Sequence, residues 1–310
     1  MTRVAGIDCG TNSIRLVIAD LTAPGGTPTL TDLHREMRVV RLGEDVDRTG
    51  RLAPQALART RVALADYAAM IEQFDVERVR MVATSATRDA ANADEFVTMV
   101  VQVLGVEPEV ITGKTEAQLS FTGAVGRLRG LPARVLVADI GGGSTELVLG
   151  STTPPAVLAA HSMDVGCVRM TERHLHSDPP RPAEIEATVR DLRAALAAAA
   201  ADVPFARAQA FVGVAGTVTT IVAIALGLPG YDPVAIHGAT ISFDQVSAVT
   251  ERLVRMTRGE RAALPVMHPG RVDVIGGGAL VLRTVMECLG ATEVIASEHD
   301  ILDGIALSLG

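Results

Sequence analysis

The sequence has no long apolar run, although 48% of its 310 residues are hydrophobic. A membrane-spanning helix needs about 18 or more consecutive apolar residues, so no membrane partner is expected. The first residues are strand-like, without the basic segment, apolar stretch and cleavage site of an export signal, and this predicts a cytoplasmic protein. A chain this apolar and this long is typical of a globular protein with two domains.

Cysteine is scarce: Cys9, Cys167 and Cys288 are the only three. They have no metal-like spacing, and reduced thiols are typical of a cytoplasmic protein. Cys9 has no histidine near it in sequence to act as a base, so catalysis by this thiol is not expected. The histidines also lack ligand-like spacing, and ordinary structural roles are expected for them.

Positive charge is in deficit, since the formal net charge is −8 at pH 7. This argues against a nucleic-acid partner. An anionic ligand must then be held by a local group of basic side chains. Those side chains are almost all arginine, because Lys114 is the only lysine, and arginine is the better bidentate ligand for phosphate.

An eleven-residue pattern occurs twice, at residues 8–18 and 139–149, with Asp, Gly, Ser, Leu and Val at the same five places. Each copy lies between apolar runs, which predicts strand, tight turn and strand. Glycines and small hydroxyl residues bring several N–H groups together as a nest for phosphate oxygens, and the Asp is placed to hold a cation or a water. One copy alone could be an ordinary hairpin; two copies with matched spacing favour a shared phosphate site.

Strands and helices alternate after an antiparallel start, which predicts an α/β class with a partly parallel sheet. Residues 23–28 form a predicted turn, and residues 84–88 a polar exit from a short strand. Strands are expected at 3–21 (two around the first turn), 29–42, 78–83, 107–111, 156–163, 208–214 and 292–296. Helices are expected at 52–74, 92–104, from 115, 184–201 and 272–289.

The second copy of the pattern begins a second series of strands and helices like that of the first half. It follows residues 128–132, where the chain is predicted to cross from one domain to the other. We therefore predict domain I over residues 1–124, completed by a C-terminal helix at 300–310, and domain II over residues 125–299. Small-molecule sites favour domain interfaces, so a ligand is expected in an interdomain cleft.

Four further stretches are candidates for phosphate chemistry. Residues 83–88 offer hydroxyls and a guanidinium, and residues 111–117 place an acid at a helix start. Residues 214–220 form a strand-to-helix turn whose helix N–H groups suit an anion. Residues 268–278 combine a basic segment with a glycine cluster.

The two patterns resemble the phosphate hairpins of the acetate kinase/actin/heat-shock ATPase superfamily, whose two domains are ribonuclease H-like. The whole set resembles the exopolyphosphatase/guanosine pentaphosphate phosphohydrolase (Ppx/GppA) family, and in length its short, two-domain actinobacterial type. The matching segments, in the expected order, are 6–16, 83–92, 111–119, 139–147, 164–172, 216–224 and 269–282. Thr115 departs from the commonest family pattern, which has a second acid there.

This resemblance implies a division of roles. Glu116 is implied to be the catalytic base, and Asp139 and Glu146 the ligands of Mg²⁺ or Mn²⁺. The implied phosphate-binding residues are Thr11, Asn12, Ser13, Arg15, Arg88, Gly142, Gly143, Ser144, Gly216, Thr217 and Arg271. Hydrolysis of a terminal phosphoanhydride needs an aligned water, a carboxylate to orient it and positive charge on the phosphoryl oxygens, which this set supplies.

Structural alternatives remain for several of these residues. An acid such as Glu116 is also favoured at a helix N-terminus by the helix dipole. Arg15 and Glu146 could be half-exposed strand residues, and Arg271 could form a surface ion pair.

The resemblance implies an exopolyphosphatase that releases orthophosphate from inorganic polyphosphate by Mg²⁺-dependent attack of water, with pppGpp as a second candidate substrate. One alternative is an ATP-dependent small-molecule kinase, since residues 276–278 resemble the nucleotide-side glycine cluster of the superfamily. Another is an ATP-gated, non-enzymatic module. Analogy and the frequency of two-fold symmetric assemblies favour a homodimer.

Overall fold

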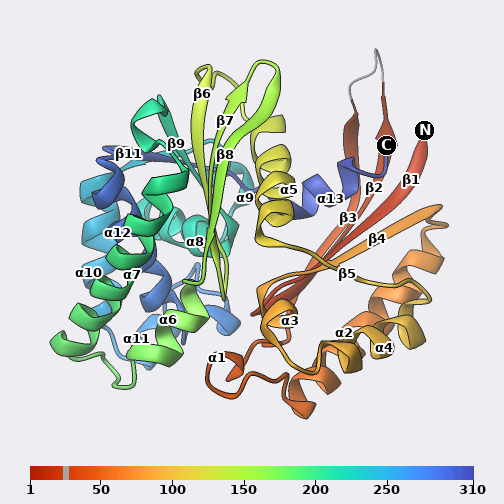
Figure 1. Ribbon diagram of the computed structural model, residues 1–310, viewed down its shortest axis with the longest axis horizontal. Helices are drawn as coiled ribbons and strands as arrows, with labels where there is room; N and C mark the ends of the chain where they lie inside the picture. Colours follow the sequence, from red (N-terminus) through yellow and green to blue (C-terminus); the bar gives the residue numbers. More distant parts are fainter. Residues whose placement is uncertain (24–27) are drawn as a thin grey trace. The chain divides into compact units, whose positions relative to one another are not determined.

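The computed structural model describes residues 1–23 and 28–310; the turn predicted at 23–28 therefore lies largely outside the described residues. The chain divides into two compact units. The first is Met1–Gly123 with Ile301–Gly310, and the second is Ala124–Asp300. Each unit is an α/β structure with its own sheet and hydrophobic core, which confirms the predicted fold class (Figure 1).

The first unit is built on a five-stranded sheet in the order β3-β2-β1-β4-β5. β1 pairs antiparallel with β2 and parallel with β4, and β4 pairs parallel with β5. The carboxyl ends of β1, β4 and β5 therefore share one edge of the sheet. The strands are β1 (Thr2–Cys9), β2 (Ser13–Thr22), β3 (Thr29–Val39), β4 (Arg78–Ala83) and β5 (Glu109–Val110).

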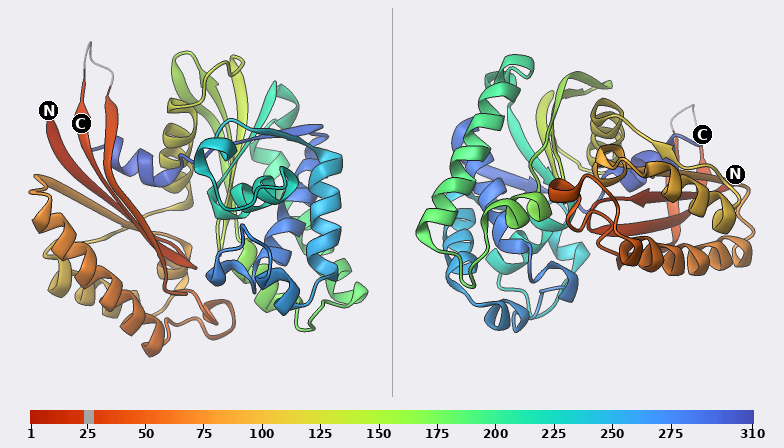
Figure 2. Two further views of the ribbon diagram at one scale, coloured as in Figure 1. Left: turned by 180° about the vertical axis from the view of Figure 1, so that it is seen from behind. Right: turned by 60° about the horizontal axis from the view of Figure 1, so that its bottom comes forward.

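Alternating residues of β1 face two different layers of helices. Ala5, Ile7 and Cys9 pack with α2 and α4, whereas Val4 packs with the C-terminal α13. Figures 1 and 2 show α13 on the face of the sheet opposite α2 and α4. The helices are α1 (Val46–Thr49), α2 (Pro54–Gln73), α3 (Ser85–Asp89), α4 (Ala93–Leu104), α5 (Gly113–Gly126) and α13 (Ile301–Leu307).

The second unit is built on a six-stranded sheet in the order β10-β11-β9-β6-β7-β8. β6 pairs antiparallel with β7 and parallel with β9, so the carboxyl ends of β6 and β9 lie side by side. The strands are β6 (Arg134–Ile140), β7 (Thr145–Thr152), β8 (Pro155–Met163), β9 (Ala210–Val214), β10 (Thr240–Ser242) and β11 (Glu293–Ala296).

One continuous apolar cluster joins this sheet to the helices of the second unit. Leu136, Ala138 and Ile140 alternate along β6 and pack with α7, α8, α10 and α12. The helices are α6 (Cys167–His174), α7 (Pro182–Asp202), α8 (Ala215–Ala225), α9 (Pro233–Ile236), α10 (Phe243–Arg255), α11 (Arg258–Ala262) and α12 (Ile275–Leu289); short 3₁₀ turns are η2 (Phe205–Arg207) and η3 (Pro269–Arg271).

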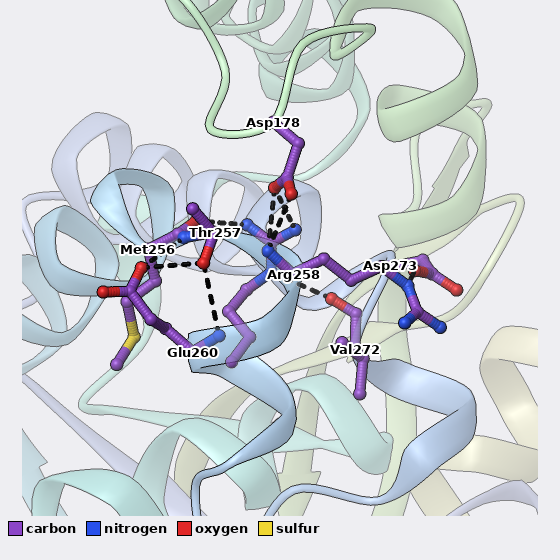
Figure 3. A network of polar contacts seen from close by, with 8 residues as sticks. Asp178, Met256, Thr257, Arg258, Glu260, Val272 and Asp273 are labelled. Atoms are coloured by element: carbon purple, nitrogen blue, oxygen red, sulfur yellow. Dashed lines mark hydrogen bonds and ion pairs between the residues drawn. The ribbon is translucent and has the colours of Figure 1, made fainter.

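A polar cluster ties three segments of the second unit together (Figure 3). The Asp178 carboxylate accepts the Arg258 backbone N–H at 2.9 Å and Arg261 Nη2 at 3.1 Å. Arg258 Nε donates to Asp273 Oδ1 at 2.6 Å. The loop before α7, helix α11 and the segment between η3 and α12 are thereby held together, and η3 carries Arg271.

The structure departs from the sequence-based prediction in several places, of which two bear on this account. Residues 84–88, predicted as a polar strand exit, contain helix α3, which is too short for a periodic sequence signal. No element was predicted between 240 and 262, where β10, α10 and α11 lie. The start of α10 does carry a local signal, a capping box formed by Ser242 and Gln245.

Candidate active site

The first hairpin turns between β1 and β2 as the pattern predicts. Gly10 N–H donates to Ser13 O at 3.0 Å and closes the turn. Asp8 and Arg15 are directly opposed across the strands. Arg15 Nη2 and Nε donate to Asp8 Oδ2 at 2.6 and 3.0 Å. The basic residue of this hairpin is therefore already bound to the aspartate of the same pattern.

The turn of the first hairpin is held from behind by the segment after β3. Gly43 N–H donates to Thr11 O at 2.8 Å, and Arg41 N–H donates to Asn12 O at 2.8 Å. The buried Thr11 hydroxyl makes a 2.8 Å hydrogen bond with the Ser85 hydroxyl of α3. The predicted phosphate-binding turn of residues 11–13 is thus fixed to two neighbouring segments.

Arg88 and Glu116 are brought together at the carboxyl edge of β4 and β5. Glu116 lies in the first turn of α5 and is 7% exposed. Arg88 Nη1 donates to Glu116 Oε2 at 3.1 Å and to Ile111 O at 2.9 Å. Arg88 therefore orients the carboxylate that the sequence predicts to be the base, a contact that sequence reasoning did not anticipate.

The second hairpin differs from the first at the same two opposed positions. Asp139 on β6 faces Glu146 on β7, so two carboxylates replace the aspartate–arginine pair. They are 6% and 1% exposed. Glu146 Oε1 accepts the Ser162 hydroxyl of β8 at 2.7 Å. Like charges directly opposed across strands are destabilising, and a divalent cation offsets that cost.

These two carboxylates fit a hard cation, which prefers oxygen ligands. Mg²⁺ is commonly held by one or two carboxylates, with waters and phosphate oxygens completing its shell. Within residues 1–23 and 28–310, no group of three or more His, Cys, Asp or Glu side chains is gathered in a metal-binding arrangement. A cation held by this pair would take its remaining ligands from other oxygen atoms, such as those of water or of a phosphate.

The strand-to-helix turn after β9 carries backbone strain. Ala215 has a φ of +68°, a left-handed conformation that is unusual for a residue with a side chain, and such strain clusters at functional sites. Arg271 covers the next residue, Gly216, so closely that a Cβ there would collide with the guanidinium. Arg271 Nη1 donates to the Thr220 hydroxyl at 2.9 Å. Arg271 is thus placed over the start of α8.

Thr217 has a packing role that the sequence did not indicate. Thr217 is 5% exposed, and its side chain packs against Gly278 of α12. A Cβ at Gly278 would lie only 2.6 Å from Thr217 Cγ2. The glycine cluster at 276–278 lies inside the buried first turn of α12. Gly277 and Gly278 therefore serve close helix packing, since a Cβ at Gly277 would collide with Thr171 Oγ1. A Cβ at Gly276 would meet nothing within 4 Å.

Cys9 and Cys167 are buried next to these loops, and burial raises the pKa of both thiols. Thiolate chemistry is disfavoured in such surroundings.

Tyr231 and Glu298 lie beside Arg271 and were not singled out from the sequence. Tyr231 donates to Glu298 Oε1 at 2.7 Å, and its hydroxyl lies 2.7 Å from that of Thr219. Burial raises the pKa of both the Tyr231 phenol and the Glu298 carboxyl. Arg271 lies 6.0 Å from the centre of the Tyr231 ring. No local motif marks these residues, because 67 positions separate them.

The predicted site residues therefore fall into two groups. In the first unit, residues 11–13, Arg15, Arg88 and Glu116 gather at one edge of the sheet. In the second unit, Asp139, Glu146, residues 142–144 and Gly216 lie at the corresponding edge, since β6 and β9 end side by side. No helix among the described residues has the length and apolarity to cross a membrane.

The chain is similar to known proteins over almost its whole length. A model of the Ppx/GppA phosphatase family matches residues 17–309. The chain is 53% identical to exopolyphosphatase 2 of Mycobacterium tuberculosis over 318 aligned residues, which cover 100% of this chain and 99% of that protein.

Solved structures give the same assignment. An exopolyphosphatase-like protein superposes with a TM-score of 0.95 at 45% identity, covering 100% of this chain and 98% of the other. A Ppx/GppA family member from Aquifex aeolicus superposes with a TM-score of 0.80 at 30% identity, covering 99% and 97%. The family model and these similarities extend over almost the whole chain. The chain therefore belongs to the Ppx/GppA phosphatase family.

Proposed function

We propose that this chain is a cytoplasmic, metal-dependent exopolyphosphatase that releases orthophosphate from the ends of inorganic polyphosphate, with pppGpp as a second candidate substrate. The observation that carries the proposal is the buried Asp139–Glu146 pair, which flanks the glycine-rich turn at residues 141–144. A cation site beside an anion-binding turn suits a phosphoanhydride. The identity to a named exopolyphosphatase supports the substrate class.

Each part of the second unit has a proposed role. The backbone N–H groups of the turn at 142–144 bind the terminal phosphate. Asp139 and Glu146 hold Mg²⁺ or Mn²⁺, which when bound offsets negative charge on the phosphate oxygens. Gly216, Thr217 and Arg271 bind phosphates further along the chain. Since the Thr217 side chain is packed against α12, we assign its contact to the backbone.

In the first unit, Glu116 is the proposed base. Its carboxylate orients the attacking water and accepts a proton from it, while Arg88 fixes the carboxylate in one position. Arg88 Nη1 is engaged by Glu116 and Ile111 O, so contact with a phosphate falls to the rest of the guanidinium. Arg15 and the turn at 11–13 bind phosphate oxygens, and Arg15 shares its charge with Asp8.

A substrate panel tests the proposal. Orthophosphate release is measured from short polyphosphate, long polyphosphate, pppGpp and ATP, each with Mg²⁺ and with EDTA. The wild type is expected to hydrolyse polyphosphate only with metal. Glu116→Gln keeps the shape of the side chain and is expected to lose about 10²–10⁴-fold in kcat. Glu107→Gln, an exposed acid in the same unit, is the control. Near-normal turnover by Glu116→Gln contradicts the assignment of the base.

The kinase and the ATP-gated module are the weaker candidates. ATP binding with acceptor-dependent formation of ADP supports the kinase, and ATP-dependent light scattering supports an assembling module. A homodimer also stays a proposal, to be measured by light scattering coupled to size-exclusion chromatography.

A further inference from the structure

Helix α6 begins directly behind the turn of the second hairpin. Its first backbone N–H groups point into that turn: Cys167 N–H donates to Gly141 O and Val168 N–H to Gly142 O, both at 2.9 Å. Arg169 N–H also donates to Gly142 O, at 3.1 Å. These groups would otherwise be unsatisfied at a helix N-terminus.

The third carbonyl of the turn is bound by a side chain. Arg169 Nε donates to Gly143 O at 2.7 Å. The carbonyls of residues 141, 142 and 143 are therefore all bound by the segment 166–169. In a trans peptide the C=O and the following N–H point in opposite directions. Binding the three carbonyls on one side thus directs the N–H groups of residues 142, 143 and 144 to the other side.

Gly166 allows this close approach. A Cβ at this position would lie 2.5 Å from Gly142 O and 2.8 Å from Gly141 O. Both contacts are with backbone, which cannot swing away as a flexible side chain can. A side chain at residue 166 would therefore displace the turn, because a non-bonded carbon cannot sit so close to these oxygens.

We propose that Gly166 and Arg169 are positioning residues, which set the direction of the phosphate-binding amides by holding the carbonyls of the turn from behind. This inference rests on the proposed function of the 142–144 turn. Arg169 acts through the Gly143 carbonyl by its Nε–H, independently of its charge. A preorganised set of amides binds an anion better than a turn that must be reoriented.

Two neutral variants isolate the Nε–H of Arg169. In Arg169→Gln, the amide nitrogen takes the place of Nε and can still donate to Gly143 O. Arg169→Met has a similar length and no donor. Both lack the charge, so the difference between them reports on this one hydrogen bond. Arg173→Gln, on the same helix and bound to Asp191, is the matched control.

The measurement is binding of inorganic phosphate by titration calorimetry in the presence of Mg²⁺, alongside KM and kcat for polyphosphate and the melting temperature. A hydrogen bond of this kind corresponds to a factor of about ten, so phosphate affinity and kcat/KM are expected about tenfold lower in Arg169→Met than in Arg169→Gln. Gly166→Ala is expected to weaken phosphate binding as well. Arg173→Gln is expected to bind as the wild type does.

Equal phosphate affinity in the Gln and Met variants overturns the proposal, as does a wild type that binds no phosphate. If each variant that loses phosphate affinity also loses melting temperature in proportion, Arg169 serves stability alone. That result also overturns the proposal. Phosphate binding is measured without turnover. A wild type that binds phosphate but does not hydrolyse polyphosphate therefore contradicts the proposed function while the comparison of Gln with Met still decides this inference.

Discussion

Replacing Glu146 by Gln separates the cost of the carboxylate pair from the benefit of a bound cation. Directly opposed cross-strand residues have Cβ atoms about 5 Å apart. Two unit charges at that separation repel by about 3 kcal/mol at an effective dielectric constant of 20. Both carboxylates make further polar interactions, so the net repulsion is smaller, about 1 kcal/mol.

Glu146→Gln removes this repulsion and keeps an oxygen that can accept the Ser162 hydroxyl. In EDTA the variant is therefore expected to melt about 2–4 °C above the wild type. Mg²⁺ is expected to reverse the order, because only the wild type retains both proposed ligands. A cation at a hundred times its Kd stabilises the folded state by about 2.7 kcal/mol.

The assay is thermal unfolding of wild type and Glu146→Gln across a Mg²⁺ titration that starts from EDTA. Glu293→Gln, an exposed acid in the same sheet, is the control and should shift in neither condition. The reasoning is refuted if Mg²⁺ raises the melting temperature of Glu146→Gln as much as that of the wild type, or if the variant is the less stable protein in EDTA.

Three further outcomes are expected. Arg88→Ala releases Glu116 from its 3.1 Å contact and should lower kcat about 10–100-fold; unchanged kcat contradicts the positioning of the carboxylate. Native alkylation near pH 8 should modify Cys288 alone, because the other two thiols are buried; mass spectrometry that finds two or three adducts contradicts this. Arg261→Met removes the hydrogen bonds from the guanidinium to Val272 O, Met256 O and Asp178, and should destabilise the fold by about 2 kcal/mol, most of it from the two carbonyls; an unchanged melting temperature contradicts it.

The hairpins were predictable because their signals are local. Glycines, short polar residues and flanking apolar runs specify a strand–turn–strand within eleven residues. The strand at 78–83 was predicted at its observed bounds, because an apolar run and a polar exit define it. The sequence also showed that Arg15 of the first copy is replaced by Glu146 in the second. In the observed register Arg15 lies opposite Asp8 and forms an ion pair, whereas Glu146 lies opposite Asp139 and forms a carboxylate pair.

The contacts that orient the site were not predictable, because they join residues far apart in sequence. Arg88 and Glu116 are 28 positions apart, and Arg169 and Gly143 are 26 apart. No periodicity or turn motif reports such pairs. The left-handed Ala215 was also hidden, since sequence rules expect glycine at a positive φ. A single sequence thus predicted the two hairpins but not the contacts that hold the side chains around them.

The most direct test of the proposed activity is a ³¹P NMR time course of polyphosphate with the wild-type protein and Mg²⁺. Removal of terminal phosphates predicts that the orthophosphate signal grows from the start and the internal-phosphate signal falls, while the end-group signal stays constant until the chains become short. An end-group signal that rises instead indicates internal cleavage, and no growth of orthophosphate indicates no hydrolysis; either result contradicts an exopolyphosphatase.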